Sequence, residues 1–294
     1  MHATRTRGPA LPRPAALLEV AALLVMLAAL TPGVAQAQDP FTDWGARIGL
    51  QAGPAWVGYR EHTGSLESEF DEPGYWFELT LEGNLAGWSP FLRAGTSGAS
   101  GLERVDGTND QRTDLRMARV WTQLGLGYRV ELGEGVVLVP RVAYAFDWFG
   151  FERSRFRING VEVVIQGVDG ELYREVDETF RSHGVLFGAA LEVELSQLVE
   201  LWSHLSVTYL PRVRVENDLG GTLHSDGAQI RSGVGCTFWL LENLGLSVGT
   251  DLTWQLLDKS RVATRRGSVS TTFVQFPYSE TINLAFLVGL RARF

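Results

Sequence analysis

The sequence predicts an all-β protein in the form of a closed, ten-stranded antiparallel transmembrane β-barrel. Two patterns in the 294 residues support this prediction. Apolar side chains recur at every second position over ten segments, which is the period of a strand with two unlike faces. The connections between these segments alternate between short and long, which is typical of the two rims of an outer-membrane barrel.

The ten segments follow one another from residue 47 to the last residue. In chain order they are 47–52, 75–82, 90–101, 119–130, 136–148, 184–195, 201–214, 230–240, 246–256 and 282–294. The prediction of a strand over 90–101 depends mainly on Leu92 and Ala94. In the last segment, apolar residues occupy every second position from Ile282 to Phe294, and the positions between them are mostly small or charged. This segment exceeds the roughly 9–11 residues that a tilted strand needs to cross a bilayer.

The connections distinguish the two rims. The short ones lie near residues 86–89, 133–135, 196–200 and 242–244, and the long ones near 62–74, 102–114, 152–182, 216–228 and 258–280. A soluble β-sandwich also alternates, because an antiparallel sheet can face water on one side. Aromatic residues near the ends of the apolar stripes favour a membrane barrel, since such residues form girdles at the two interfaces. They are Trp148, Tyr209, Trp254 and Phe294.

Residues 1–37 are expected to form a secretory signal peptide, which leaves residues 38–294 as the outer-membrane barrel. Arg5, Arg7 and Arg13 precede an apolar run over 15–30, and Ala35 and Ala37 supply the small residues of a cleavage site. The alternative is an N-terminal membrane anchor. The apolar run is shorter than the roughly 20 residues of a spanning helix, which favours removal after Ala37.

The composition excludes several functions. With 26 Lys and Arg against 34 Asp and Glu, the formal net charge is −8, which argues against nucleic-acid binding because that requires a basic surface. Cys236 is the only cysteine, so an internal disulfide framework and a cysteine-based zinc site are excluded. The histidines show no metal-ligand spacing, and we expect neither a metal nor another cofactor.

The polar face of the alternating segments predicts a charged lumen. A barrel of about eight strands is filled by its own side chains, and ten strands lie close to that size. Opposite charges inside should pair, because an unpaired buried charge is destabilising. The two interpretations are a salt-bridged plug and a narrow polar conduit. The candidate lumen residues are Arg47, Glu78, Glu82, Arg93, Arg119, Arg129, Arg141, Asp147, Glu192, Glu194, His204, Arg212, Arg214, Arg231, Asp251 and Arg291.

The last segment resembles the C-terminal signature of bacterial outer-membrane β-barrel proteins, in which a final Phe follows apolar residues at every second position. This resemblance implies that the barrel-insertion machinery reads the strand that ends at Phe294. It also implies a location in the outer membrane of a Gram-negative-type cell, with outer-membrane lipid and lipopolysaccharide as partners. We therefore expect a structural, small-pore or surface-interaction role.

The strand number, the loop spacing and the stretch 149–160 also resemble the omptins, outer-membrane proteases with an aspartate pair in the second loop and an Asp–His pair in the fourth. This resemblance implies the alternative function, a surface endopeptidase. Its catalytic residues would be Asp106 and Asp110 in the second long connection, with His224 and Asp226 in the fourth. The spacing departs from the omptin pattern, because the two aspartates are four residues apart and the histidine precedes its aspartate.

Overall fold

The computed structural model describes residues 44–64, 66–107, 110–167, 170–219, 221–260, 263–266 and 271–294. The signal peptide expected over 1–37 lies outside the described residues. Within the described part of the chain, no helix has the length and apolar character needed to cross a membrane.

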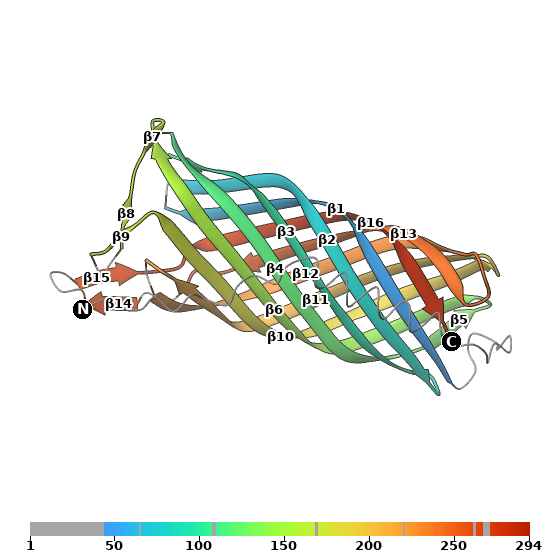
Figure 1. Ribbon diagram of the computed structural model, residues 1–294. Coiled ribbons are helices and arrows are strands. Elements are labelled where there is room, and N and C mark those ends of the chain that lie inside the picture. Colours follow the sequence, from blue (N-terminus) through green and yellow to red (C-terminus); the bar gives the residue numbers. More distant parts are fainter. Residues whose placement is uncertain are drawn as a thin grey trace, which may run out of the picture. The chain divides into compact units, whose positions relative to one another are not determined.

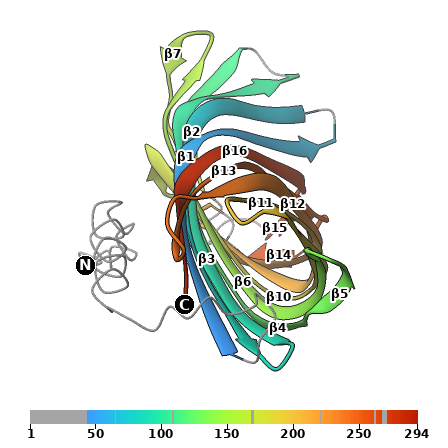
Figure 2. The same ribbon diagram turned by 90° about the vertical axis from the view of Figure 1, so that its right-hand side faces the viewer.

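Ten long antiparallel strands of the described chain form one closed ring (Figure 1), as the sequence predicts. They are β1 (Trp44–Thr63), β2 (Leu66–Leu85), β3 (Trp88–Asp106), β4 (Gln111–Tyr128), β6 (Val136–Ile158), β10 (Glu175–Ser196), β11 (Val199–Asn217), β12 (Gly221–Trp239), β13 (Leu244–Leu257) and β16 (Tyr278–Arg293). Each strand pairs with the next, and β16 pairs with β1 to close the ring, which Figure 2 shows from one end.

Short strands lie at the two ends of the ring. They are β5 (Val130–Gly133), β7 (Val161–Glu162), β8 (Ile165–Gln166), β9 (Leu172–Tyr173), β14 (Ala263–Arg266) and β15 (Thr271–Val274). The end that carries the tight connections after β2, β5, β10 and β12, together with Phe294, is called the turn end. The opposite end, which carries β7, β8, β9, β14 and β15, is called the loop end (Figure 1).

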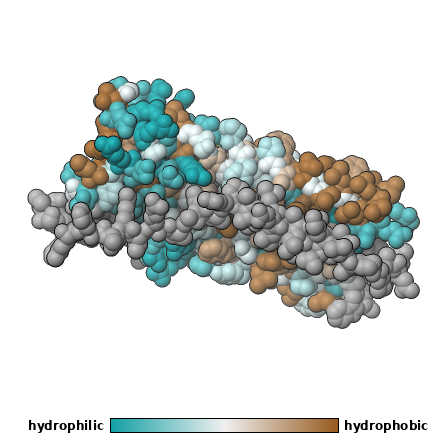
Figure 3. Space-filling view, viewed as in Figure 1, coloured by the Kyte–Doolittle hydropathy of each residue, from teal (hydrophilic) through white to brown (hydrophobic). Residues whose placement is uncertain are grey.

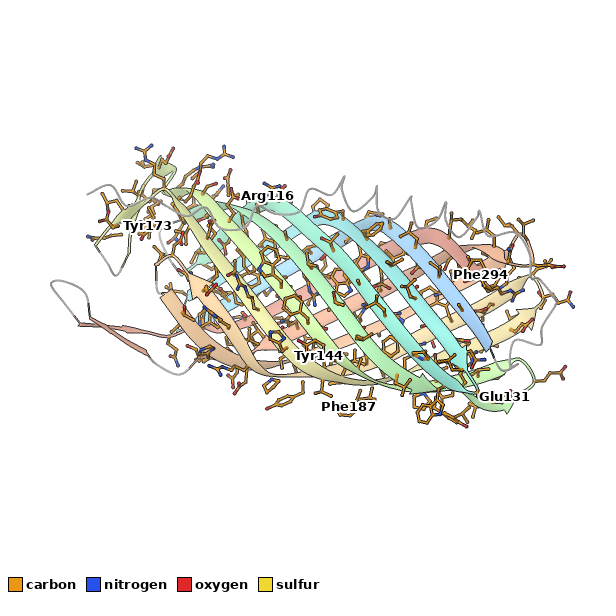
Figure 4. All side chains as sticks on the ribbon, turned by 60° about the horizontal axis from the view of Figure 1, so that its bottom comes forward. Arg116, Glu131, Tyr144, Tyr173, Phe187 and Phe294 are labelled. Atoms are coloured by element: carbon orange, nitrogen blue, oxygen red, sulfur yellow. The ribbon has the colours of Figure 1, made fainter. Side chains whose placement is uncertain are left out.

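The outer surface near the turn end is apolar. Phe187 is 62% exposed and Leu205 is 58% exposed, and both side chains point away from the lumen. Figure 4 shows Phe187 and Tyr144 projecting from the wall, and Figure 3 shows apolar residues gathered towards the turn end and hydrophilic ones towards the loop end. We call this apolar surface the apolar band. The prediction that the apolar stripe faces outward is therefore confirmed.

Towards the loop end the alternation is inverted. On β1, Val57 and Tyr59 point inward and are buried, whereas Arg60 points outward and is exposed. On β10, Phe180 is buried inside while Arg181 lies on the outer surface. A strand end exposed to water on its outer face must bury its apolar residues inside the barrel. This half of the barrel consequently has a conventional hydrophobic core.

The prediction of a long connection is wrong for three segments, because the chain there continues as strands. β1 continues to Thr63 and β2 begins at Leu66, so the two strands cover most of the predicted connection 62–74. The hairpins β3–β4 and β11–β12 likewise replace most of the connections 102–114 and 216–228. The outward-facing charges of these strand ends make the sequence look like a solvated loop, although every second residue still points into the core. The connections 152–182 and 258–280 do hold extra chain between β6 and β10 and between β13 and β16.

The placement of Arg212 and Arg214 in the lumen is also wrong. The pairing of β11 with β12 shifts between Leu210 and Val213, which is a β-bulge. The bulge includes Pro211, which cannot donate a ladder hydrogen bond. It reverses the facing of the later residues, so that Val213 is buried inside and the two arginines are exposed outside.

Candidate functional site: the ion-paired lumen

The lumen between the strands is crossed by three layers of charged side chains, which we call belts. The turn-end belt consists of Arg47, Arg129, Arg141, Arg291, Glu82, Glu192 and Glu200. The middle belt consists of Arg93, Arg119, Arg231, Glu78, Asp147 and Asp251. The loop-end belt consists of Arg153, Glu61, Glu103 and Glu178. Each belt joins strands from opposite sides of the ring.

The turn-end belt holds its carboxylates with arginines from several strands. Glu192 Oε2 accepts hydrogen bonds from Arg47 NH1 at 2.9 Å and from Arg129 NH2 at 2.7 Å. Arg141 NH2 donates to Glu82 at 2.7 Å. Four guanidinium groups thus face three carboxylates in this belt, and the belt carries one positive charge in excess.

The middle belt is balanced, with three guanidinium groups and three carboxylates. Arg231 donates to Asp251 at 2.9 and 2.8 Å and also contacts Glu78. Arg119 forms a two-pronged pair with Asp147, to which it donates from Nε and NH2. Such charge-assisted pairs offset the cost of burying each charge, and removing one partner leaves a charge that is strongly destabilising.

Aromatic rings and one histidine support the middle belt. The Arg231 guanidinium lies 5.2 Å from the centre of the Trp76 ring and 5.7 Å from that of Trp121, within the range of a cation–π contact. His204 Nε2 lies 3.2 Å from Asp251 Oδ2, and its ring stacks on Trp202. These contacts fix the belt at the height of the apolar band.

An aromatic plug closes the lumen between the middle belt and the loop-end belt. Phe151 packs against Tyr59, Phe149 and Phe180 at ring-centre distances of 4.5, 4.8 and 5.4 Å. Phe276, from the chain between β15 and β16, packs against Phe180 at 5.3 Å. All five side chains are buried, so this section of the lumen is filled by rings.

The loop-end belt places three carboxylates around one guanidinium. Arg153 donates to Glu103 at 2.8 Å and to Glu178 at 2.8 Å, and it lies 3.8 Å from Glu61. Tyr59 donates its hydroxyl hydrogen to Glu61. Burial raises the pKa of Glu61 to about 7, against the opposing effect of Arg153 and with a further increase from Glu178. This belt therefore changes charge near neutral pH.

Side chains at the rim complete the loop-end belt. Ser68 Oγ donates to Glu103 at 2.7 Å, and Asn217 Nδ2 donates to Glu178 at 2.9 Å. The sequence alone does not reveal this belt, because Glu103, Arg153 and Glu178 fall in predicted long connections and Glu61 borders one. The signal that could have identified them is the inverted alternation. Over 176–182, for example, every second residue is buried while the residues between are charged or polar.

The four predicted catalytic residues lie on two hairpins that are separated in the ring by β6 and β10. Asp106 ends β3, and Asp110 lies in the following turn, where Arg112 donates to it at 2.8 Å. His224 points outward from β12, with its Nε2 3.3 Å from Arg212 NH2, and Asp226 is also exposed. Among the described residues, no hydrogen bond or ion pair joins the two aspartates to His224 or Asp226. This arrangement does not favour the protease alternative.

Comparison with known proteins identifies the fold. No protein-family model matches the chain, and no curated protein matches it. Among solved structures, the chain is similar to the outer membrane protease OmpT from Escherichia coli, with a TM-score of 0.57 at 10% identity over 88% of this chain and 99% of that one. The translocator domain of the autotransporter NalP from Neisseria meningitidis matches with a TM-score of 0.41 at 12% identity, covering 94% and 98%. OprG from Pseudomonas aeruginosa matches with a TM-score of 0.38 at 10% identity, covering 87% and 99%. The fold is that of the bacterial outer-membrane β-barrels.

Proposed function

We propose that the protein is an integral barrel of the bacterial outer membrane that does not conduct ions and that acts through the surface of its loop end. The closed ring and the apolar band support the membrane location, because a strand can face lipid only where its outward side chains are apolar. The loop end, with its polar outer surface and extra strands, would face the outside of the cell. This is the side on which outer-membrane barrels carry their longer loops.

The observation that carries this proposal is the filling of the lumen. In the middle belt, Arg231 pairs with carboxylates from two other strands. The aromatic plug around Phe151 lies on the loop-end side of this belt. A permeating ion would have to break buried ion pairs and separate packed rings. Both steps are costly in a low-dielectric interior. A structural and surface-interaction role therefore fits the lumen better than a pore.

Conductance across a planar bilayer tests this proposal. The refolded chain is expected to give no discrete current steps at voltages where a general porin conducts. The heat-dependent gel mobility of the same preparation checks that the barrel has folded and inserted. Regular current steps from the unmodified chain would overturn the proposal.

Export and insertion are part of the same proposal. Residues 1–37 would direct the chain across the inner membrane and be removed after Ala37, and the insertion machinery would recognise the strand that ends at Phe294. The mass of the mature chain and its heat-dependent mobility on a gel would test both steps. A mature chain that still carries residues 1–37 would contradict the first step.

Lipopolysaccharide is the proposed lipid partner of the outer surface. Arg212 and Arg214 follow Tyr209 on β11 and are exposed on the outer surface just beyond the apolar band. Guanidinium groups match the geometry of phosphates, which lipopolysaccharide carries near the membrane surface. Replacing both arginines with glutamine is expected to weaken the stabilisation of the barrel by added lipopolysaccharide.

The protease alternative, with Asp106, Asp110, His224 and Asp226 as catalytic residues, stays a prediction. It has a direct test, the cleavage of a library of basic peptides. Activity that is present in the unmodified chain and lost in His224→Ala would support it.

A further inference from the structure

A small cavity opens within the turn-end belt. It has a volume of about 30 Å³ and lies between β1, β2, β3, β11, β12 and β16. Gly49 leaves room for it, because a Cβ at this position would overlap Thr80 Oγ1. The charged and aromatic residues that line it are Arg47, Arg93, Arg291, Glu82, Glu200 and Trp239.

The carboxylates of this cavity are already engaged by arginines. Glu82 accepts a hydrogen bond from Arg141 at 2.7 Å. Glu200 Oε1 lies 3.3 Å from Arg47 NH1 and 3.6 Å from Arg291 NH1. Arg93 pairs with Glu78 of the middle belt at 3.3 Å, so the excess charge comes from the turn-end belt itself, in which four guanidinium groups face three carboxylates. A partly buried excess charge of this kind is stabilised by a counter-ion.

One residue of the lining has an unused hydrogen-bond donor. Trp239 is 4% exposed, and its Nε1 has no hydrogen-bond partner among the described residues. The Nε atoms of Arg129 and Arg141, in the same belt, are likewise buried without a partner. An indole N–H and a guanidinium are donors only, and neither can accept a proton from a ligand. The unsatisfied groups here therefore call for an acceptor.

We propose that this cavity is a binding site for a small monovalent anion of the size of chloride. An anion would accept the hydrogen bond of Trp239 and neutralise the excess guanidinium charge. The positive excess of the turn-end belt disfavours a cation. Water is the competing occupant, since the volume would hold one or two molecules, and it would satisfy the donor but leave the charge. The site is separate from the loop-end surface and does not depend on its role.

Anomalous diffraction with bromide tests the proposal on the full mature chain. Crystals grown in sodium bromide are expected to show a bromide peak in the cavity, within about 3.5 Å of Trp239 Nε1. A cavity that holds only water at high bromide concentration would overturn the proposal. This measurement needs no variant and is independent of bilayer conductance, so its failure would leave the non-conducting barrel untouched.

A chloride titration of thermal stability supplies the second test. At constant ionic strength with gluconate as the replacement anion, the melting temperature should rise with chloride and saturate. Trp239→Phe removes the donor and keeps most of the ring, and it should raise the half-saturating chloride concentration several-fold. Trp121→Phe is the matched control, because its Nε1 is also buried with no partner among the described residues, but Trp121 does not line the cavity. Equal shifts in both variants, or no chloride dependence, would count against the site.

Discussion

The two halves of the barrel share the same strands but place their apolar side chains on opposite faces of the wall. Near the turn end, Leu205 on β11 is 58% exposed and faces outward; a few residues later on the same strand, Val213 is 0% exposed and faces the lumen. The difference lies in the medium outside the wall, which is lipid around the first half and water around the second. The face on which a strand carries its apolar residues therefore shows which side of the wall is apolar. In one chain this can be the outer side, against lipid, or the inner side, in a packed core.

The lumen differs between the halves in a matching way. Around the apolar band it is filled by paired charges, whereas towards the loop end it is filled first by rings and then by the acidic loop-end belt. The charge of the belts runs from one excess guanidinium at the turn end, through balance in the middle, to two excess carboxylates at the loop end. Four predictions probe this contrast.

The largest effect is expected in the middle belt. Arg231→Met removes the guanidinium that Asp251 and Glu78 share, and it leaves two buried carboxylates with fewer partners. The free energy of unfolding, measured by denaturant titration of the barrel in lipid vesicles, should fall by about 3–5 kcal/mol. Arg212→Met, on the outer surface, is the control and should change it by less than about 0.5 kcal/mol. Equal effects would mean that the lumen is hydrated throughout.

A charge on the outer surface should be tolerated in one half only. Leu205→Arg places a guanidinium in the middle of the apolar band and should lower the free energy of unfolding by about 2–4 kcal/mol. Thr179→Arg, outward on β10 in the loop-end half, should have little effect because its side chain lies in water. The same vesicle titration checks both. Equal tolerance at the two positions would contradict the inversion.

The loop-end belt should make stability depend on pH. The pKa of Glu61 is raised to about 7 in the folded barrel, so its contribution is present at low pH and is lost as pH rises through about 7. The shift corresponds to about 3 kcal/mol between pH 5 and pH 9. Glu61→Gln should remove this dependence, whereas Glu69→Gln, on the outer surface, should retain it. An unchanged pH profile in Glu61→Gln would show that another group titrates.

The smallest effect is expected at His224. Its ring is exposed and contacts Arg212, so His224→Ala should change the free energy of unfolding by less than about 0.5 kcal/mol. Thermal unfolding of the refolded variant checks this. A large loss of stability would mean that the histidine has a structural role that its exposed position does not explain.

The sequence predicts the half of the fold that faces lipid and misses much of the other half. It predicts β16 because Phe286 and Val288 alternate with inward residues over a full span. Over the β1–β2 hairpin the sequence predicts a connection, because Glu69 and Asp71 face water, although Phe70 between them is buried. The bulge before Val213 could not be predicted either, since it depends on pairing with β12.

The site was predictable in composition and not in pairing. Alternation alone places Arg231, Asp251 and Glu78 in the lumen. Which of them meet depends on the tilt and register of strands that lie far apart in the chain; Arg231 and Glu78 are 153 residues apart. The sequence does not predict the loop-end belt, because it does not predict the strand ends that carry it.

Lipid-dependent fluorescence quenching tests the inversion most directly. The chain has a single cysteine, Cys236, on the outer surface of β12 between Val234 and Phe238. A dye on this thiol should be quenched strongly by lipids that carry nitroxides on their tails and weakly by a water-soluble quencher. In a Cys236→Ser background, a dye at Arg214→Cys should show the opposite preference. Strong quenching of both positions by lipid tails, or of neither, would contradict the account.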